Sequence, residues 1–153
     1  MVFSWIGLLI ALSILAPNLA ALVWQPRNMP ENLKDAHIVF TLLERLGQVA
    51  CLLLSIFAPA ASGSQSSGLW LALAVLCVVV YVSLWARYFA KSRDFRLLFQ
   101  PLLFLPIPMA VFPVLAFAFA AVWLQSWWLG LAAALFAIGH LANSWHTYRR
   151  MVQ

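Results

Sequence analysis

The sequence predicts an all-α polytopic membrane protein, a compact bundle of five transmembrane helices. Three observations favour this fold class. Of the 153 residues, 65% are hydrophobic and only 8% are charged, and the mean hydropathy is +0.96. A soluble domain is about 45–50% apolar and about 25% charged. Apolar stretches long enough to cross a bilayer also follow one another with short turns between them, and the basic residues gather in alternate turns.

This composition excludes several classes of protein. An extracellular disulfide scaffold, a nucleic-acid-binding domain and an ordinary cytosolic enzyme all need more polar surface than the chain offers. A net charge of +5 would suggest nucleic acid in a soluble chain, but basic residues beside apolar spans orient a protein in a membrane. We therefore expect membrane lipids as partners, a homo-oligomer as a further option, no nucleic acid, and a bacterial-type inner (plasma) membrane as the location.

The first three spans are separated by turns of distinct composition. Span one is expected over residues 2–24; it has no basic region before it, so we expect it to be retained rather than cleaved. It ends at QPRNMPEN, where Pro30 suits a first helical position, and span two is expected over residues 37–59. The uncharged Gly/Ser turn at 62–68 leads to span three, expected over residues 69–89.

The last two spans are expected over residues 102–123 and 128–147, with LQSWWLG as a tight turn between them. Fused into one helix they would reach roughly 45 residues, too long for a bilayer of about 30 Å. Three prolines in the fourth span, Pro106, Pro108 and Pro113, remove backbone donors and predict an irregular start, either a kinked turn or a break that lines a cavity.

The basic residues give an orientation to a single transmembrane domain that covers residues 1–153. With five spans, all nine lysines and arginines fall in or beside the turns and the tail on one side of the membrane, whereas the turns on the other side carry no charge. The positive-inside rule makes the basic side cytoplasmic. The N-terminus is then expected outside and the C-terminus in the cytoplasm.

Two spans carry polar residues along one face. In span two the spacing i, i+3, i+4, i+7 holds Thr41, Glu44, Arg45 and Gln48. Span five repeats this spacing with His140, Asn143, Ser144 and Thr147. Lipid cannot satisfy such groups, so we expect the two stripes to touch, with Glu44 or Gln48 within hydrogen-bond reach of span five. Gly47 and Gly139 lie at the same level and would let the helices approach closely.

These polar residues lie in the cytoplasmic half or at the midplane, which predicts a pocket that opens toward the cytosol. A charged group inside a membrane usually pairs or lines a cavity. We expect Arg45 or Arg87 to neutralise Glu44 or to meet an anionic head group, His140 and Glu44 to handle protons, and aromatic side chains to form a wall. The expected ligand-binding residues are Glu44, Arg45, Gln48, Tyr81, Trp85, Arg87, His140 and Asn143.

Three functions remain open on this basis. The leading one is a pocket that binds, and transports, a small amphipathic or anionic ligand. The second is an intramembrane enzyme that acts on a lipid or isoprenoid, with Glu44 and His140 as the acid–base pair. The third is an assembly subunit without catalysis, whose polar stripes only clasp helices. No cofactor and no metal is expected, because His146 lies about 240° round the helix from His140 and cannot share a metal ion with it.

In overall plan the chain resembles the tryptophan-rich sensory protein (translocator protein) family, through its size, five expected spans and eight tryptophans. The resemblance implies the binding of an amphipathic ligand, since that family binds porphyrins and sterols. The segments QPRNMPEN, WARYF and GHLANSWHTYRR depart from that family's Trp-Pro-rich first loop and from its motifs on spans two, three and five. The resemblance therefore assigns no role to any individual residue.

Overall fold

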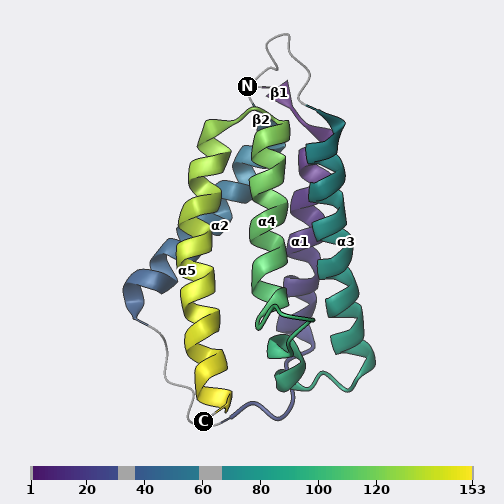
Figure 1. The fold of residues 1–153 in the computed structure, drawn as a ribbon, viewed down its shortest axis with the longest axis vertical. Coiled ribbons are helices and arrows are strands. Elements are labelled where there is room, and N and C mark those ends of the chain that lie inside the picture. Colours follow the sequence, from purple (N-terminus) through teal and green to yellow (C-terminus); the bar gives the residue numbers. More distant parts are fainter. Residues whose placement is uncertain (1, 31–36, 59–66, 153) are drawn as a thin grey trace.

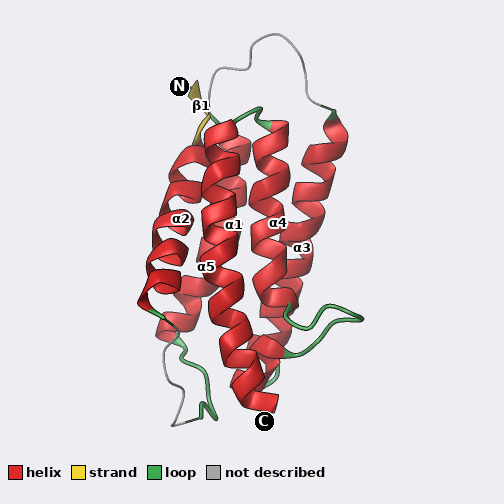
Figure 2. Ribbon diagram, turned by 60° about the vertical axis from the view of Figure 1, so that its left-hand side comes forward, coloured by secondary structure: helices red, strands yellow, loops and turns green. Residues whose placement is uncertain are grey.

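Five α-helices lie side by side in the computed structural model, which describes residues 2–30, 37–58 and 67–152 (Figure 1). Three helices are long and apolar enough to cross a membrane, as expected of an integral membrane protein: α1 (Trp5–Val23), α2 (Ile38–Ile56) and α3 (Gly68–Ala90). Two more complete the bundle, the shorter apolar α4 (Pro108–Trp123) and the 26-residue α5 (Trp127–Val152). The described chain is thus predominantly helical, and its first and last helices place the two termini at opposite ends (Figures 1 and 2).

Two short strands close one end of the bundle and shorten the first two expected spans. β1 (Val2–Phe3) pairs antiparallel with β2 (Phe57–Ala58), so these residues are extended rather than helical. Ser4 then caps α1, because its Oγ accepts a hydrogen bond from the backbone N–H of Gly7 at 3.0 Å. α1 therefore starts three residues later than expected from position 2, and α2 ends before residue 59.

The fourth span starts later than expected, and prolines explain the delay. The 3₁₀ turn η1 (Phe95–Phe99) precedes a tight turn in which Leu102 and Leu105 exchange backbone hydrogen bonds of 3.0 Å. α4 begins only at Pro108, a first-turn position where the missing N–H costs nothing. Pro113, by contrast, lies inside α4 without ending it, so the predicted irregularity is confined to the segment before Pro108.

Other boundaries also differ from expectation. Pro30 is not helical, and the described part of α2 begins at Ile38 with His37 as its N-cap. α5 continues past residue 147, because Arg149 and Arg150 in its last turn complement the negative end of the helix dipole. Most of the predicted turn at 62–68 lies outside the described residues.

Two loops are tied together at the end of the bundle that holds the C-terminus. The N–H of Arg27 donates to the carbonyl of Arg93 at 2.8 Å, and the side-chain amide of Asn28 donates to Asp94 at 3.2 Å. The backbone N–H of Arg96, 2.9 Å from Asp94 Oδ1, and the amide of Asn28 together hold the pKa of Asp94 below its usual value. The connection after α1 is thus fixed to the one after α3.

Small residues let α2 and α5 pack with their backbones in near contact. A Cβ atom built on Gly139 would lie 2.3 Å from the backbone nitrogen of Glu44, and one built on Gly47 would lie 2.4 Å from that of Phe136. Both distances are far shorter than any real Cβ contact. The predicted close approach at Gly47 and Gly139 is therefore confirmed.

The core lies mainly between α3, α4 and α5. Tyr88, Phe117 and Phe136 are among its largest fully buried side chains. Cys51 and Cys77 are free thiols within the same buried cluster.

We expect Gly139→Ala to destabilise the protein. Alanine is the better helix former by about 1 kcal/mol, but overpacking against the backbone of α2 costs about 1–3 kcal/mol, so the clash decides the sign. Gly130→Ala in the same helix is the matched control, since its Cβ would meet only Ala121 at an ordinary 3.9 Å. Thermal unfolding in detergent measures both variants. A higher melting temperature for Gly139→Ala would contradict the close packing.

Candidate functional site

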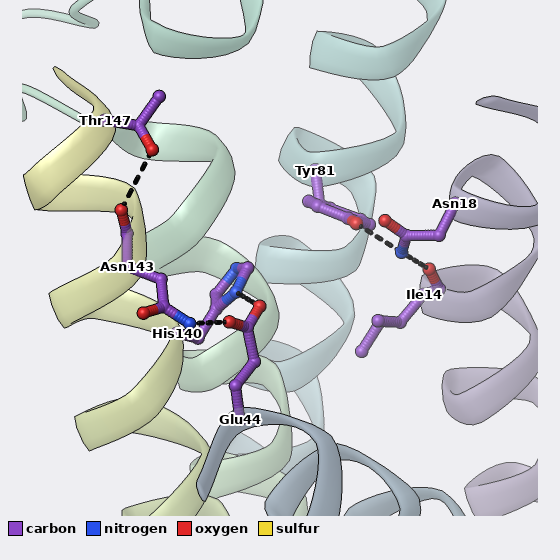
Figure 3. Close-up of polar contacts among 7 residues, drawn as sticks. All are labelled: Ile14, Asn18, Glu44, Tyr81, His140, Asn143 and Thr147. Carbon is purple, nitrogen blue, oxygen red and sulfur yellow. Dashed lines mark hydrogen bonds and ion pairs between the residues drawn. The ribbon is translucent and has the colours of Figure 1, made fainter. Parts of the chain in front are cut away.

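A carboxylate, an imidazole and an amide meet between α2 and α5 (Figure 3). Glu44 Oε1 lies 2.6 Å from His140 Nδ1, and Asn143 Nδ2 donates a hydrogen bond to Glu44 Oε2. The His140 and Glu44 side chains are 23% and 25% exposed, so the pair is largely withdrawn from the surface. The predicted contact between the polar stripes of spans two and five is confirmed.

The sequence of α5 places two donors opposite one carboxylate. His140 and Asn143 are three residues apart and so lie on neighbouring turns of one face. The ring of Phe136, one turn before His140, stacks on the imidazole with a centroid separation of 4.8 Å and an interplanar angle of 20°. Thr147 Oγ1 donates to the backbone carbonyl of Asn143 at 3.1 Å (Figure 3). The orientation of the His140 imidazole is thus fixed by the ring of Phe136 on one face and by Glu44 at Nδ1.

A second polar pair joins α1 to α3 (Figure 3). The amide of Asn18 donates to the hydroxyl of Tyr81 at 2.9 Å and to the backbone carbonyl of Ile14 at 2.7 Å. Tyr81 is only 3% exposed, and its ring meets that of Trp85 edge to face. This pair lies at the same level of the bundle as Glu44 and His140, since all four residues line one cavity.

Two adjoining cavities bring these groups together. One, of about 320 Å³, is lined on its polar side by Asn18, Glu44, Gln48, Tyr81 and His140. The other, of about 200 Å³, shares Asn18, Tyr81 and His140 and adds Trp85 and Ser144. Its far wall comes from Leu98 and Phe99 of η1. Side chains from α1, α2, α3 and α5 therefore border one polar region.

The imidazole is the chemically versatile group in this region. Its Nδ1 faces the Glu44 carboxylate, so its Nε2 lies on the opposite side of the ring, and His140 borders both cavities. A carboxylate at one ring nitrogen fixes the tautomer of the neutral ring, with the proton on Nδ1 and a lone pair on Nε2. The arrangement can therefore accept a hydrogen bond or a proton from a ligand.

Two predicted site residues lie elsewhere. Arg45 is exposed on α2, because the position after Glu44 is turned by about 100° round the helix. Arg87 points toward η1, where its Nη2 lies 3.4 Å from the carbonyl oxygen of Leu97. Neither arginine borders the two cavities. Within the described residues, the ion pair expected between Glu44 and an arginine is replaced by the contact with His140.

The remaining predicted residues are brought together, and others join them. Gln48, Tyr81, Trp85 and Asn143 all border the cavities or bind Glu44. Phe136 was missed as a positioning residue, although its place four residues before His140 is a usable signal. Nothing in the sequence predicted that Leu98 and Phe99 of η1 line a cavity, because only the tertiary fold brings that turn next to the polar residues. No three histidine, cysteine or carboxylate side chains gather as a metal site within the described ranges.

Comparison of the chain with protein-family models, with curated proteins and with solved structures gives no match. The resemblance to the translocator protein family therefore rests on the overall plan alone. Function has to be inferred from the geometry of the Glu44 site.

A double-mutant cycle tests whether Glu44 and His140 act as a unit. We expect Glu44→Gln and His140→Gln each to lower the free energy of unfolding by about 1–3 kcal/mol, since each removes the partly buried contact between the carboxylate and the imidazole. The double variant should lose far less than the sum, with a coupling energy of about 0.5–3 kcal/mol. Ser83→Ala is the control, because Ser83 is exposed and bonds only its own helix in the described structure. Strictly additive losses, measured by chemical unfolding in detergent, would show that the two residues are independent.

Proposed function

We propose that this protein crosses a bacterial-type inner membrane five times, and that its polar cavities bind and transport a small amphipathic ligand from the cytosolic side. The succession of helices supports the five crossings. α1 to α5 alternate in direction along one bundle (Figures 1 and 2), and α4 and α5 are distinct helices joined by a turn at 124–126. Each helix would then cross once.

The charge distribution supports the orientation. The end of the bundle that holds the C-terminus also carries the basic residues of the described loops and tail: Arg27, Lys91, Arg93, Arg96, Arg149 and Arg150. The opposite turns have no charged residue in the sequence. By the positive-inside rule, the C-terminus and the cavities beside it face the cytosol, and the N-terminus lies outside.

The observation that carries the ligand proposal is the shared polar border of the two cavities. Ligand pockets are mostly apolar with a few convergent polar groups, and cavities of about 300–1,000 Å³ suit small molecules. Here Asn18, Tyr81 and His140 border both cavities, Glu44 and Gln48 join them in one and Ser144 in the other, and the rest of the lining is apolar. A molecule with a small polar head and an apolar body fits this distribution.

The placement of the arginines bears on the choice between an amphipathic and an anionic ligand. An anionic head group needs a cation, and Arg45 and Arg87 do not border the cavities. The residues that line the two cavities include no arginine or lysine. We therefore favour an amphipathic ligand with an uncharged or weakly acidic head that hydrogen-bonds the polar groups of the cavities.

A second candidate function rests on the same short contact. A carboxylate 2.6 Å from an imidazole is the arrangement of a general acid–base pair, which would suit an intramembrane enzyme acting on a lipid or isoprenoid. The third candidate, an assembly subunit or homo-oligomer held by a polar clasp, requires the Glu44 contact but no occupant in the cavities.

Cysteine labelling tests the proposed topology. A cysteine introduced at Gln65 should react with an impermeant maleimide in intact cells, whereas one at Ser92 should react only after permeabilisation. The buried native thiols of Cys51 and Cys77 make the unmodified chain a low-background control. The reverse labelling pattern would place the cavities on the other side of the membrane.

Native mass spectrometry of the purified full chain tests for a ligand. We expect a bound small molecule that is retained in Ser83→Ala and reduced more than roughly tenfold in Gln48→Leu and Asn18→Leu, because these remove polar cavity walls worth about 1.5 kcal/mol each. The melting temperature of Gln48→Leu should stay close to that of the wild type, since the Glu44 clasp is intact. A chain that carries no such molecule, or carries it equally in all variants, would favour the assembly role.

A further inference from the structure

A separate groove lies between the start of α2 and the last turns of α5. Its volume is about 510 Å³, and its polar wall consists of His37 from α2 and His146, Arg149 and Arg150 from α5. None of these residues borders the cavities at Glu44. The start of α2 and the last turns of α5 lie toward the end of the bundle that holds the C-terminus (Figure 1), so the positive end of the α2 dipole adds to the basic side chains that line the groove.

The polar wall presents hydrogen-bond donors. His37 Nδ1 accepts a hydrogen bond from the backbone N–H of Val39 at 3.3 Å, so in the neutral ring the proton lies on Nε2 and can be donated. His146 lines the same wall, but its Nε2 is buried, without a hydrogen-bond partner among the described residues, and so is not a donor at the surface of the groove. Arg149 and Arg150 contribute two exposed guanidinium groups. Donors of this kind match the oxygens of a phosphate group.

The rest of the groove is apolar and continues along the outside of α5. Phe40, Ala142 and Trp145 form its other wall. From there an apolar stripe follows the helix at i, i+3, i+4 spacing, away from the basic end: Ile138, Leu135 and Leu131, which are 52%, 37% and 49% exposed. Trp145 stands between the charged groups and this stripe, the position that tryptophan favours at a membrane interface.

We propose that this groove binds an anionic phospholipid, with its phosphodiester on Arg149 and Arg150 and an acyl chain along the stripe of α5. The donors select the phosphate, and the net positive wall selects a lipid whose head group has no compensating cation. The stripe distinguishes a lipid from a free phosphate ion, which would gain nothing from apolar contacts. The site needs only that α5 lies in the membrane and does not depend on a ligand in the Glu44 cavities.

Lipid titration of the purified full chain tests the site. We expect phosphatidylglycerol in mixed micelles to raise the melting temperature, phosphatidylcholine to raise it less, and inorganic phosphate to have no effect at the same concentration. Arg149→Gln/Arg150→Gln should weaken the apparent affinity for phosphatidylglycerol by about fivefold per arginine. The matched control Lys91→Gln/Arg96→Gln removes two exposed charges from the same end of the bundle and should leave the affinity unchanged.

A variant that changes no charge separates the groove from general electrostatic attraction. Ala142→Trp fills the groove from its half-buried wall and should abolish the preference for phosphatidylglycerol with both arginines present. An equal loss in the Lys91/Arg96 control, an unchanged affinity in Ala142→Trp, or a response to inorganic phosphate equal to that of phosphatidylglycerol would each overturn the proposal.

Discussion

Lipid offers no hydrogen bond to a carboxylate, and this constraint on Glu44 organises the bundle. The carboxylate binds His140 and Asn143 of α5, and the glycines at 47 and 139 let the two backbones come close enough for that contact. This close approach restricts both positions to glycine, because a larger residue at either one would push the helices apart. The same contact turns His140 Nε2 away from Glu44, and His140 borders both cavities, which adjoin α1 and α3.

The sequence could predict this contact because helical periodicity is strict in an apolar segment. Polar residues at i, i+3, i+4 and i+7 stand out against leucine and alanine, and two such stripes leave few alternatives for pairing. The arginines were harder to place. Arg45 belongs to the polar stripe of α2 by its spacing. A stripe of this kind covers more than 100° of the helix surface, however, and Arg45 lies at the edge that is exposed. Arg87 bonds Leu97, a partner in a turn whose position depends on the whole bundle.

Helix boundaries, like the positions of the arginines, depend on contacts with distant parts of the chain, whereas the presence of a helix follows from local sequence. Hydropathy predicts where an apolar segment lies, but capping and strand pairing decide where the helix starts. Val2 and Phe3 are apolar enough for a span and are nevertheless extended, since Phe57 and Ala58 supply backbone partners from a distant part of the chain. The prolines predicted an irregular start to α4, which begins only at Pro108. They did not predict the turn in which Leu102 and Leu105 exchange backbone hydrogen bonds.

That turn before α4 has a consequence for the surrounding bilayer. Its tip, Leu103 and Phe104, is 86% and 90% exposed and lies just before α4. At about 1.5 Å per residue, the 16 residues of α4 reach only about 24 Å, less than a hydrocarbon core of about 30 Å. If α4 crosses the membrane as proposed, this hydrophobic mismatch would be relieved by local thinning or by flanking apolar groups. We expect the tip to immerse in the acyl region beside α4, so that its two side chains extend the apolar surface of this short helix and the bilayer needs less thinning there.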